Sequence, residues 1–233
     1  MGDDTDPAFF FFQYAFSATA VTIVAGTLAE RCKMASYFSY SFFLTGFVYP
    51  VVVHNICECN NCRLPSPIRC DANALLSFTI QLIAGSNEGY FSTANSKALV
   101  GMGMVDFAGS GVVHLTGGTT ALLATYILGP RRGRFYDGNG QALSKPGLTK
   151  GHSASLQMMG TMILWFCWYG FNPGSALLLN AADNKGHIAA VAAVNTTLSA
   201  AAGAISALFT NGILSFRREG EFSLDIVLAM NGW

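Results

Sequence analysis

Charged residues are absent from long stretches of this 233-residue chain, and that absence limits its possible folds more than any other feature. The hydrocarbon core of a bilayer is about 30 Å thick, and a helix of roughly 20 apolar residues crosses it with every backbone amide satisfied internally. Five uncharged stretches are long enough: residues 8–29, 35–53, 107–129, 153–182 and 188–216. A sixth, largely apolar stretch occupies residues 222–233. The sequence therefore predicts five full membrane-crossing helices and part of a sixth.

Composition supports a membrane protein and excludes two other classes. Hydrophobic residues make up 52% of the chain and charged residues 11%, against roughly 25% charged residues in an ordinary soluble domain. The 13 Lys and Arg residues balance 13 Asp and Glu residues, which argues against a nucleic-acid-binding protein. An aromatic content of 12% excludes a disordered chain. The expected fold class is all-α, a polytopic membrane helix bundle that forms a single domain over residues 1–233.

The basic residues between the predicted spans indicate an orientation. If the first span ends in the cytoplasm, nine Lys and Arg residues fall in inner loops and four in outer loops. The inner nine are Arg31, Lys33, Arg131, Arg132, Arg134, Lys145, Lys150, Arg217 and Arg218; the outer four are Arg63, Arg69, Lys97 and Lys185. Cytoplasmic loops carry the excess of Lys and Arg in membrane proteins. The sequence thus predicts an outside N-terminus.

Two ionisable residues accompany the third predicted span, and such residues are costly in a membrane. Asp106 stands at its start, where a carboxylate either caps the first backbone N–H groups or stabilises a cation. His114 follows eight residues later, about 12 Å deeper if the helix is continuous. At that depth we expect a neutral imidazole that donates from one nitrogen and accepts at the other. His114 is then a satisfied interior histidine, a proton carrier or a pore-lining group.

Aromatic residues crowd the end of the fourth predicted span, over residues 165–175. They suit either an interfacial belt at the headgroup level or a vestibule whose ring faces attract cations. Asn172, Pro173 and Gly174 are typical of a helix end, so we expect the helix to stop there. The glycines of the third and fourth spans predict close packing between helices. They are Gly109, Gly111, Gly117, Gly118, Gly160, Gly170 and Gly174.

Three sequence strings together resemble the ammonium transporter family (Amt/Mep/Rh). They are residues 12–16 running to 28–31, residues 106–114, and residues 151–155 followed by 168–175. The resemblance covers residues 8–54 and about 86–233, with the order and spacing of the spans preserved. It implies the family's fold of eleven helices in two inverted halves, of which this chain matches the third helix to the start of the eighth. It also implies a homotrimer, with one pore in each subunit, in the plasma membrane.

The resemblance also assigns roles to five residues. Phe16 and Phe171 match the stacked phenylalanines that close the outer vestibule, and Ser175 matches the serine that hydrogen-bonds ammonium there. Asp106 matches the buried aspartate below the vestibule, and His114 matches the first of two pore histidines. The implied function is membrane transport of ammonium or methylammonium. Ammonium is recruited at the aromatic vestibule and deprotonated, and ammonia passes the pore histidine. We expect no enzyme activity, no cofactor, no metal and no nucleic-acid partner.

The chain also departs from the family pattern. We expect it to lack the first two helices and the second pore histidine, so that the transport apparatus is incomplete. No Trp lies between His54 and Asp106. Residues 55–85 interrupt the resemblance and form either an insertion or gene-model artefact, a disulfide-held loop or a zinc site. The cysteines of this stretch are Cys57, Cys59, Cys62 and Cys70.

These departures keep two other functions open. One is a non-transporting membrane protein, either an ammonium sensor or an accessory or degenerate fragment. The other is a membrane metalloenzyme that uses His54, His152 and the cysteines. The two histidines fall on opposite sides of the predicted membrane, which argues against a shared metal ion.

Overall fold

The computed structural model of the protein describes residues 7–57, 90–91, 97–98, 101, 103, 106–145, 147, 151–179 and 184–232. Within these ranges the regular elements are helices, and β pairing is limited to one isolated bridge between Tyr136 and Ala142. The predicted all-α fold is confirmed. The chain divides into two compact units, Met1–Thr149 and Lys150–Trp233, and each is described by itself. The single domain stays a prediction. The origin of residues 55–85 also stays a prediction, since residues 58–85 lie outside the described part.

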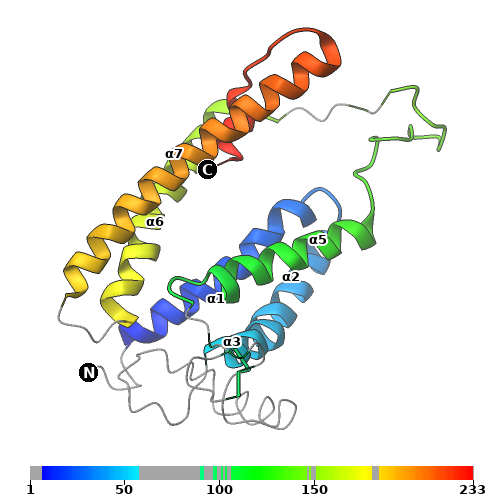
Figure 1. Cartoon of the computed structure of the whole chain (residues 1–233). Coiled ribbons are helices and arrows are strands. Elements are labelled where there is room, and N and C mark those ends of the chain that lie inside the picture. Colours follow the sequence, from blue (N-terminus) through cyan, green and yellow to red (C-terminus); the bar gives the residue numbers. More distant parts are fainter. Residues whose placement is uncertain are drawn as a thin grey trace. The chain divides into compact units, whose positions relative to one another are not determined.

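Six helical elements form the described part of the first unit (Figure 1). α2, η1 and α3 follow one another without a break, so the predicted span at residues 35–53 is helical, with one π-helical turn at its centre. η2 and α5 are also continuous, and they cover the predicted span at residues 107–129 from Ser110 to Leu128. The elements are α1 (Pro7–Leu28), α2 (Met34–Phe43), η1 (Leu44–Val48), α3 (Tyr49–Cys57), η2 (Ser110–Leu115) and α5 (Thr116–Leu128).

The core of the first unit lies between α1 and α5, which run side by side (Figure 1). Gly117 allows the close approach, because a Cβ atom there would lie 2.9 Å from Ile23 Cβ and 3.0 Å from the carbonyl oxygen of Ala20. Ala20 and Val24 of α1 are fully buried. The predicted packing role is thus confirmed for Gly117. A Cβ atom at Gly118 would meet nothing within 4 Å, so this glycine makes no such contact.

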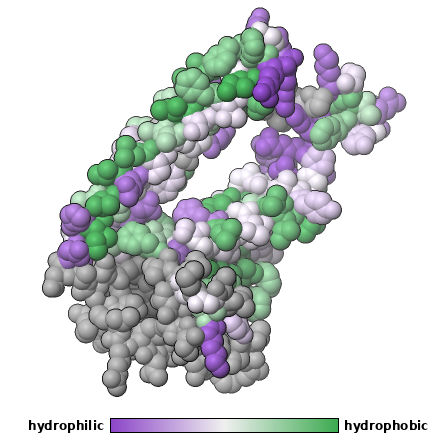
Figure 2. Space-filling view, viewed as in Figure 1, coloured by the Kyte–Doolittle hydropathy of each residue, from purple (hydrophilic) through white to green (hydrophobic). Residues whose placement is uncertain are grey.

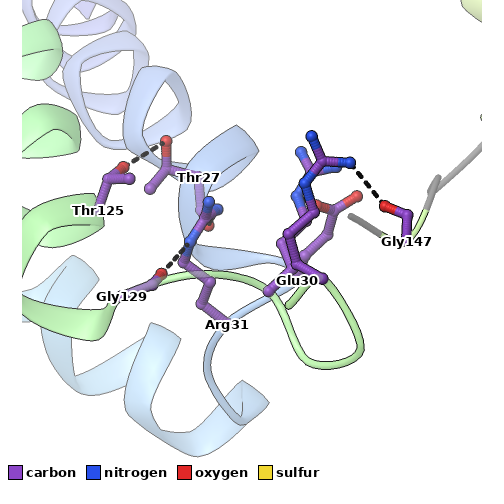
Figure 3. Close-up of polar contacts among 8 residues, drawn as sticks. Thr27, Glu30, Arg31, Thr125, Gly129 and Gly147 are labelled. Carbon is purple, nitrogen blue, oxygen red and sulfur yellow. Dashed lines mark hydrogen bonds and ion pairs between the residues drawn. The ribbon is translucent and has the colours of Figure 1, made fainter. Parts of the chain in front are cut away.

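Polar contacts join the ends of α1 and α5 (Figure 3). Arg31 Nε donates to the carbonyl oxygen of Gly129 at 3.0 Å, and Arg31 Nη1 donates to that of Thr27 at 2.8 Å. Glu30 forms an ion pair with Arg131. The last carbonyl groups of a helix have no partner within the helix and attract basic side chains. Arg31 therefore satisfies carbonyl groups at the ends of both helices.

The second unit contains a pair of long helices, α6 (Ala154–Leu179) and α7 (Lys185–Glu219), and a short helix α8 (Ile226–Met230). α6 and α7 run side by side (Figure 1). The chain then turns back along α7. Asn211 Nδ2 donates to the carbonyl oxygen of Ser223 at 3.3 Å, and Gln157 Nε2 of α6 donates to that of Val227 at 3.3 Å. The predicted sixth apolar stretch thus contains only one described helix, of five residues.

In the part of the chain that the structure describes, four helical segments are long and apolar enough to cross a membrane: Phe11–Leu28, Met34–Val53, Ser110–Leu128 and Lys185–Glu219. They match four of the five predicted spans. α6 matches the other span and has 26 residues, about 39 Å at 1.5 Å per residue. It is not among these four segments. Figure 2 shows hydrophobic residues along these helices, and Phe42 and Tyr126 are 83% and 86% exposed. Such apolar surfaces suit lipid.

The prediction that α6 ends at Asn172–Gly174 is wrong. The helix continues to Leu179 with Pro173 inside it. Proline lacks the N–H group that would bond the carbonyl oxygen four residues earlier, but membrane helices tolerate it where neighbouring helices supply polar contacts. α7 supplies two such contacts beside Pro173, through Thr196 and Thr197.

Candidate functional site

Asp106 is buried and its carboxylate caps the start of η2. Asp106 Oδ2 accepts hydrogen bonds from the backbone N–H groups of Gly111 at 3.0 Å and Val112 at 2.8 Å. Ser110 Oγ donates to Asp106 Oδ1 at 3.3 Å. Of the two alternatives from the sequence, the structure shows the capping contacts. A charge that caps a helix N-terminus can also act on a cation nearby, so the second role stays a prediction.

Gly109 makes the turn between Asp106 and η2. Its φ of +81° lies in the left-handed region that glycine adopts without steric cost. A Cβ atom there would lie 2.8 Å from Val113 Cγ2 and 3.1 Å from Phe16 Cε1. The ring of Phe16, in α1, therefore packs directly against the turn, where it is buried. This turn brings Phe16 and Asp106 to the same end of η2.

His114 is held by the same turn. The backbone N–H groups of Val113 and His114 both donate to the carbonyl oxygen of Gly109 at 2.9 Å, and His114 Nδ1 lies 3.2 Å from that oxygen. A carbonyl oxygen only accepts, so Nδ1 carries the proton and donates. In a neutral ring Nε2 is then the acceptor. The contact identifies Nδ1 as a donating nitrogen, and the neutral state of the ring stays a prediction.

The expected separation of about 12 Å between Asp106 and His114 assumes one continuous helix. That assumption is wrong, because residues 106–109 are not helical and η2 begins at Ser110. The Asp106 carboxylate instead accepts hydrogen bonds from the backbone N–H groups of Gly111 and Val112, and Gly109 between them has a positive φ. His114 consequently lies only four residues beyond the start of its helix, on an exposed part of the first unit.

Phe171 and Ser175 lie one helical turn apart on α6, in the second unit. Ser175 is fully buried, and its Oγ donates to the carbonyl oxygen of Phe171 at 2.8 Å. Because the hydroxyl hydrogen is used in this bond, the lone pairs of Ser175 Oγ are oriented to accept from another donor. The structure thus brings together Phe16, Asp106 and His114 in one unit and Phe171 and Ser175 in the other.

Sequence reasoning missed the polar contacts between α6 and α7. Tyr169 and Thr197 share a hydrogen bond of 2.6 Å between their hydroxyl oxygens, and Asn172 Nδ2 donates to Thr196 Oγ1 at 3.0 Å. The signal was the run of polar residues at Asn195–Thr197 within an otherwise apolar span. Polar side chains at such positions commonly bond across neighbouring membrane helices.

The cysteines of residues 55–85 do not form a metal or disulfide site within the described part of the chain. Cys59, Cys62 and Cys70 lie outside the described residues, as does the side chain of Cys57, so the zinc and disulfide alternatives are untested. Among the residues that the structure describes, no group of three or more His, Cys, Asp or Glu side chains is placed to hold a metal ion.

The sequence matches the model of the Ammonium Transporter Family over residues 2–232. The chain belongs to this family. Two relatives in Arabidopsis thaliana, Ammonium transporter 1 member 2 and Ammonium transporter 1 member 1, are 39% identical over 220 residues and 41% identical over 212 residues. Ammonium transporter 1 member 2 of Oryza sativa subsp. japonica is 41% identical over 213 residues. These matches cover 91%, 88% and 88% of the chain but 36% of each relative.

The chain thus spans little more than a third of the length of these curated family members. No solved structure matches it. The resemblance seen in the sequence is confirmed at the level of the family, as is the multi-pass membrane architecture. The roles assigned to Phe16, Asp106, His114, Phe171 and Ser175 stay predictions.

Proposed function

We propose that the chain is part of an ammonium transporter that moves ammonium or methylammonium across the plasma membrane. The observation that carries this proposal is the arrangement around Gly109. There Asp106 caps η2 and His114 donates from Nδ1, and in a neutral ring Nε2 is then the acceptor. A neutral acceptor of this kind suits ammonia, which offers N–H donors and carries no charge. The relatives named above are ammonium transporters by their names.

In the proposed mechanism, Phe16, Phe171 and Ser175 each keep the vestibule role that the family resemblance implies for them. The Ser175 hydroxyl donates to Phe171, so its oxygen accepts an N–H of ammonium, while the ring faces compensate for part of the lost water. The negative charge of Asp106 stabilises the cation at this stage. Burying an ion further along a dry pore costs far more than burying a neutral molecule. Ammonium therefore loses a proton, and ammonia passes His114, whereas K⁺ has no proton to lose and is excluded.

We further propose a homotrimer as the assembled form, in keeping with the resemblance. The large apolar side chains exposed on single helices, such as Phe42 and Tyr126, require lipid or other protein surfaces around each subunit.

The test is uptake of labelled methylammonium by cells that lack ammonium transporters of their own. The whole chain is expressed alone and as a chimera, in which it replaces the matched segment of Ammonium transporter 1 member 1 from Arabidopsis thaliana. We expect the chimera to give saturable uptake that ammonium inhibits and K⁺ does not. The His114→Ala variant of the chimera should lose at least nine-tenths of the uptake, roughly 1.4 kcal/mol or more in the barrier.

The controls decide between transport and the other functions. The unmodified relative serves as the positive control, and the amount of each protein at the cell surface is measured with an epitope tag. A chimera that reaches the surface and binds methylammonium without saturable uptake would contradict the proposal and favour an ammonium sensor. Uptake that K⁺ inhibits as strongly as ammonium would contradict the deprotonation step.

A further inference from the structure

A backbone defect lies between the two α6 residues of the proposed vestibule. In a regular helix the N–H of residue 173 would donate to the carbonyl oxygen of Tyr169, but Pro173 has no N–H group. Phe171 lies within this turn, and Ser175 lies two residues beyond it. The helix beside both residues therefore has one backbone hydrogen bond fewer than a regular helix, and its backbone geometry depends on other contacts.

The hydrogen bond between Asn172 and Thr196 lies directly beside this defect. Asn172 Nδ2 donates to Thr196 Oγ1 at 3.0 Å, and Thr196 is buried. The single hydroxyl hydrogen of Thr196 is directed to the carbonyl oxygen of Ala192 at 2.7 Å, so Thr196 Oγ1 accepts from Asn172. Both hydrogen bonds therefore have a defined direction, and the one from Asn172 fixes the residue next to Pro173 to α7.

This contact connects to the vestibule serine through one backbone group. Asn172 follows Phe171, whose carbonyl oxygen accepts the hydrogen bond from Ser175 Oγ at 2.8 Å. A shift of Asn172 moves that carbonyl oxygen, and the orientation of the Ser175 hydroxyl follows it. The contact between Tyr169 and Thr197, at 2.6 Å, holds the other side of the same turn.

We propose that Asn172 and Thr196 are positioning residues for Ser175: their hydrogen bond holds the turn weakened by Pro173, and so orients the serine oxygen that meets ammonium. The inference rests on the proposed function, because it names further residues that serve the same recruitment site. It predicts an effect on the affinity for the transported ion, with little effect on the amount of folded protein.

The test uses substitutions that keep the side-chain shape. Thr196→Val in the chimera removes the acceptor oxygen and retains the branched side chain, whereas Thr196→Ser retains the oxygen. The loss of one buried hydrogen bond corresponds to about a five- to tenfold change. We expect Thr196→Val to raise the KM for methylammonium by about that factor and to leave the maximal rate per surface molecule within about twofold. Thr196→Ser should restore the KM to within about twofold of the unmodified chimera.

Two further variants complete the design. Ser206→Ala removes another α7 hydroxyl, which is exposed and bonds only the backbone of its own helix, so the KM should stay unchanged. Asn172→Leu should raise the KM like Thr196→Val, and the double variant should be no worse than either single one, because both remove the same bond.

Three results would overturn the inference. One is an unchanged KM in Thr196→Val and Asn172→Leu while the unmodified chimera transports. Another is a constant KM in these two variants together with less protein at the surface and a lower maximal rate. This result would show that the hydrogen bond supports folding alone. The last is an unmodified chimera at the surface without uptake, which overturns the proposed function together with this inference and is thus distinguishable from the first two.

Discussion

Replacing Gly109 by alanine tests the turn that joins Asp106, Phe16 and His114. The φ of +81° costs a residue with a Cβ atom roughly 1–2 kcal/mol. The new Cβ would also lie 2.8 Å from Val113 Cγ2 and 3.1 Å from Phe16 Cε1. Overpacking of this kind costs about 1–3 kcal/mol, because Val113 is fully buried and cannot move freely. The sum predicts a loss of roughly 2–5 kcal/mol in the free energy of unfolding.

The assay is thermal stability in mild detergent, measured as the fraction of tagged protein that stays monodisperse after heating. For a protein of this size 1 kcal/mol corresponds to about 2–4 °C, so the Tm should fall by roughly 4–20 °C. Gly118→Ala is the matched control, because a Cβ atom there meets nothing within 4 Å and the backbone is helical. Equal melting temperatures for Gly109→Ala and the unchanged protein would refute the reasoning.

Substitutions at three further residues are tested by the same assay. Gly117→Ala places a Cβ atom 2.9 Å from Ile23 Cβ and 3.0 Å from a backbone oxygen of α1, so the Tm should fall by an amount equivalent to about 1–3 kcal/mol. Asp106→Ala leaves two buried N–H groups without their acceptor and should cost about 2–4 kcal/mol, whereas Asp106→Asn keeps an acceptor oxygen and should cost less than half as much. Glu30→Gln breaks an ion pair of half-exposed side chains and should cost less than about 1 kcal/mol.

The spans and the fold class could be predicted because lipid imposes a simple rule on the sequence. Each backbone amide must be satisfied within its helix, so long uncharged stretches read directly as helices. The family is indicated by three strings together, residues 12–16 running to 28–31, 106–114, and 151–155 followed by 168–175, and the comparison confirms it. The packing role of Gly117 also followed from the small size of glycine, although its partners in α1 did not.

The local geometry of the candidate site could not be predicted in the same way. Asp106 and His114 were placed on one helix, since nothing in the sequence marks Gly109 as a residue with positive φ rather than a helical glycine. Pro173 was expected to end α6, but Thr196 and Thr197 lie on another helix, and their contacts are long-range. Near Pro173 the partners of Tyr169 and Asn172 lie 28 and 24 residues further along the chain, so local sequence does not show them.

The central claim is that the chain's own residues conduct ammonium as part of a transporter. The most direct measurement is methylammonium flux into proteoliposomes that contain the purified chimera, with His114→Ala as the paired variant. We predict saturable flux in the chimera that ammonium inhibits and K⁺ does not, reduced at least tenfold by the substitution. The folded state of the chimera and its orientation in the liposomes are checked first. If the flux is then no greater than in protein-free liposomes, the account is contradicted.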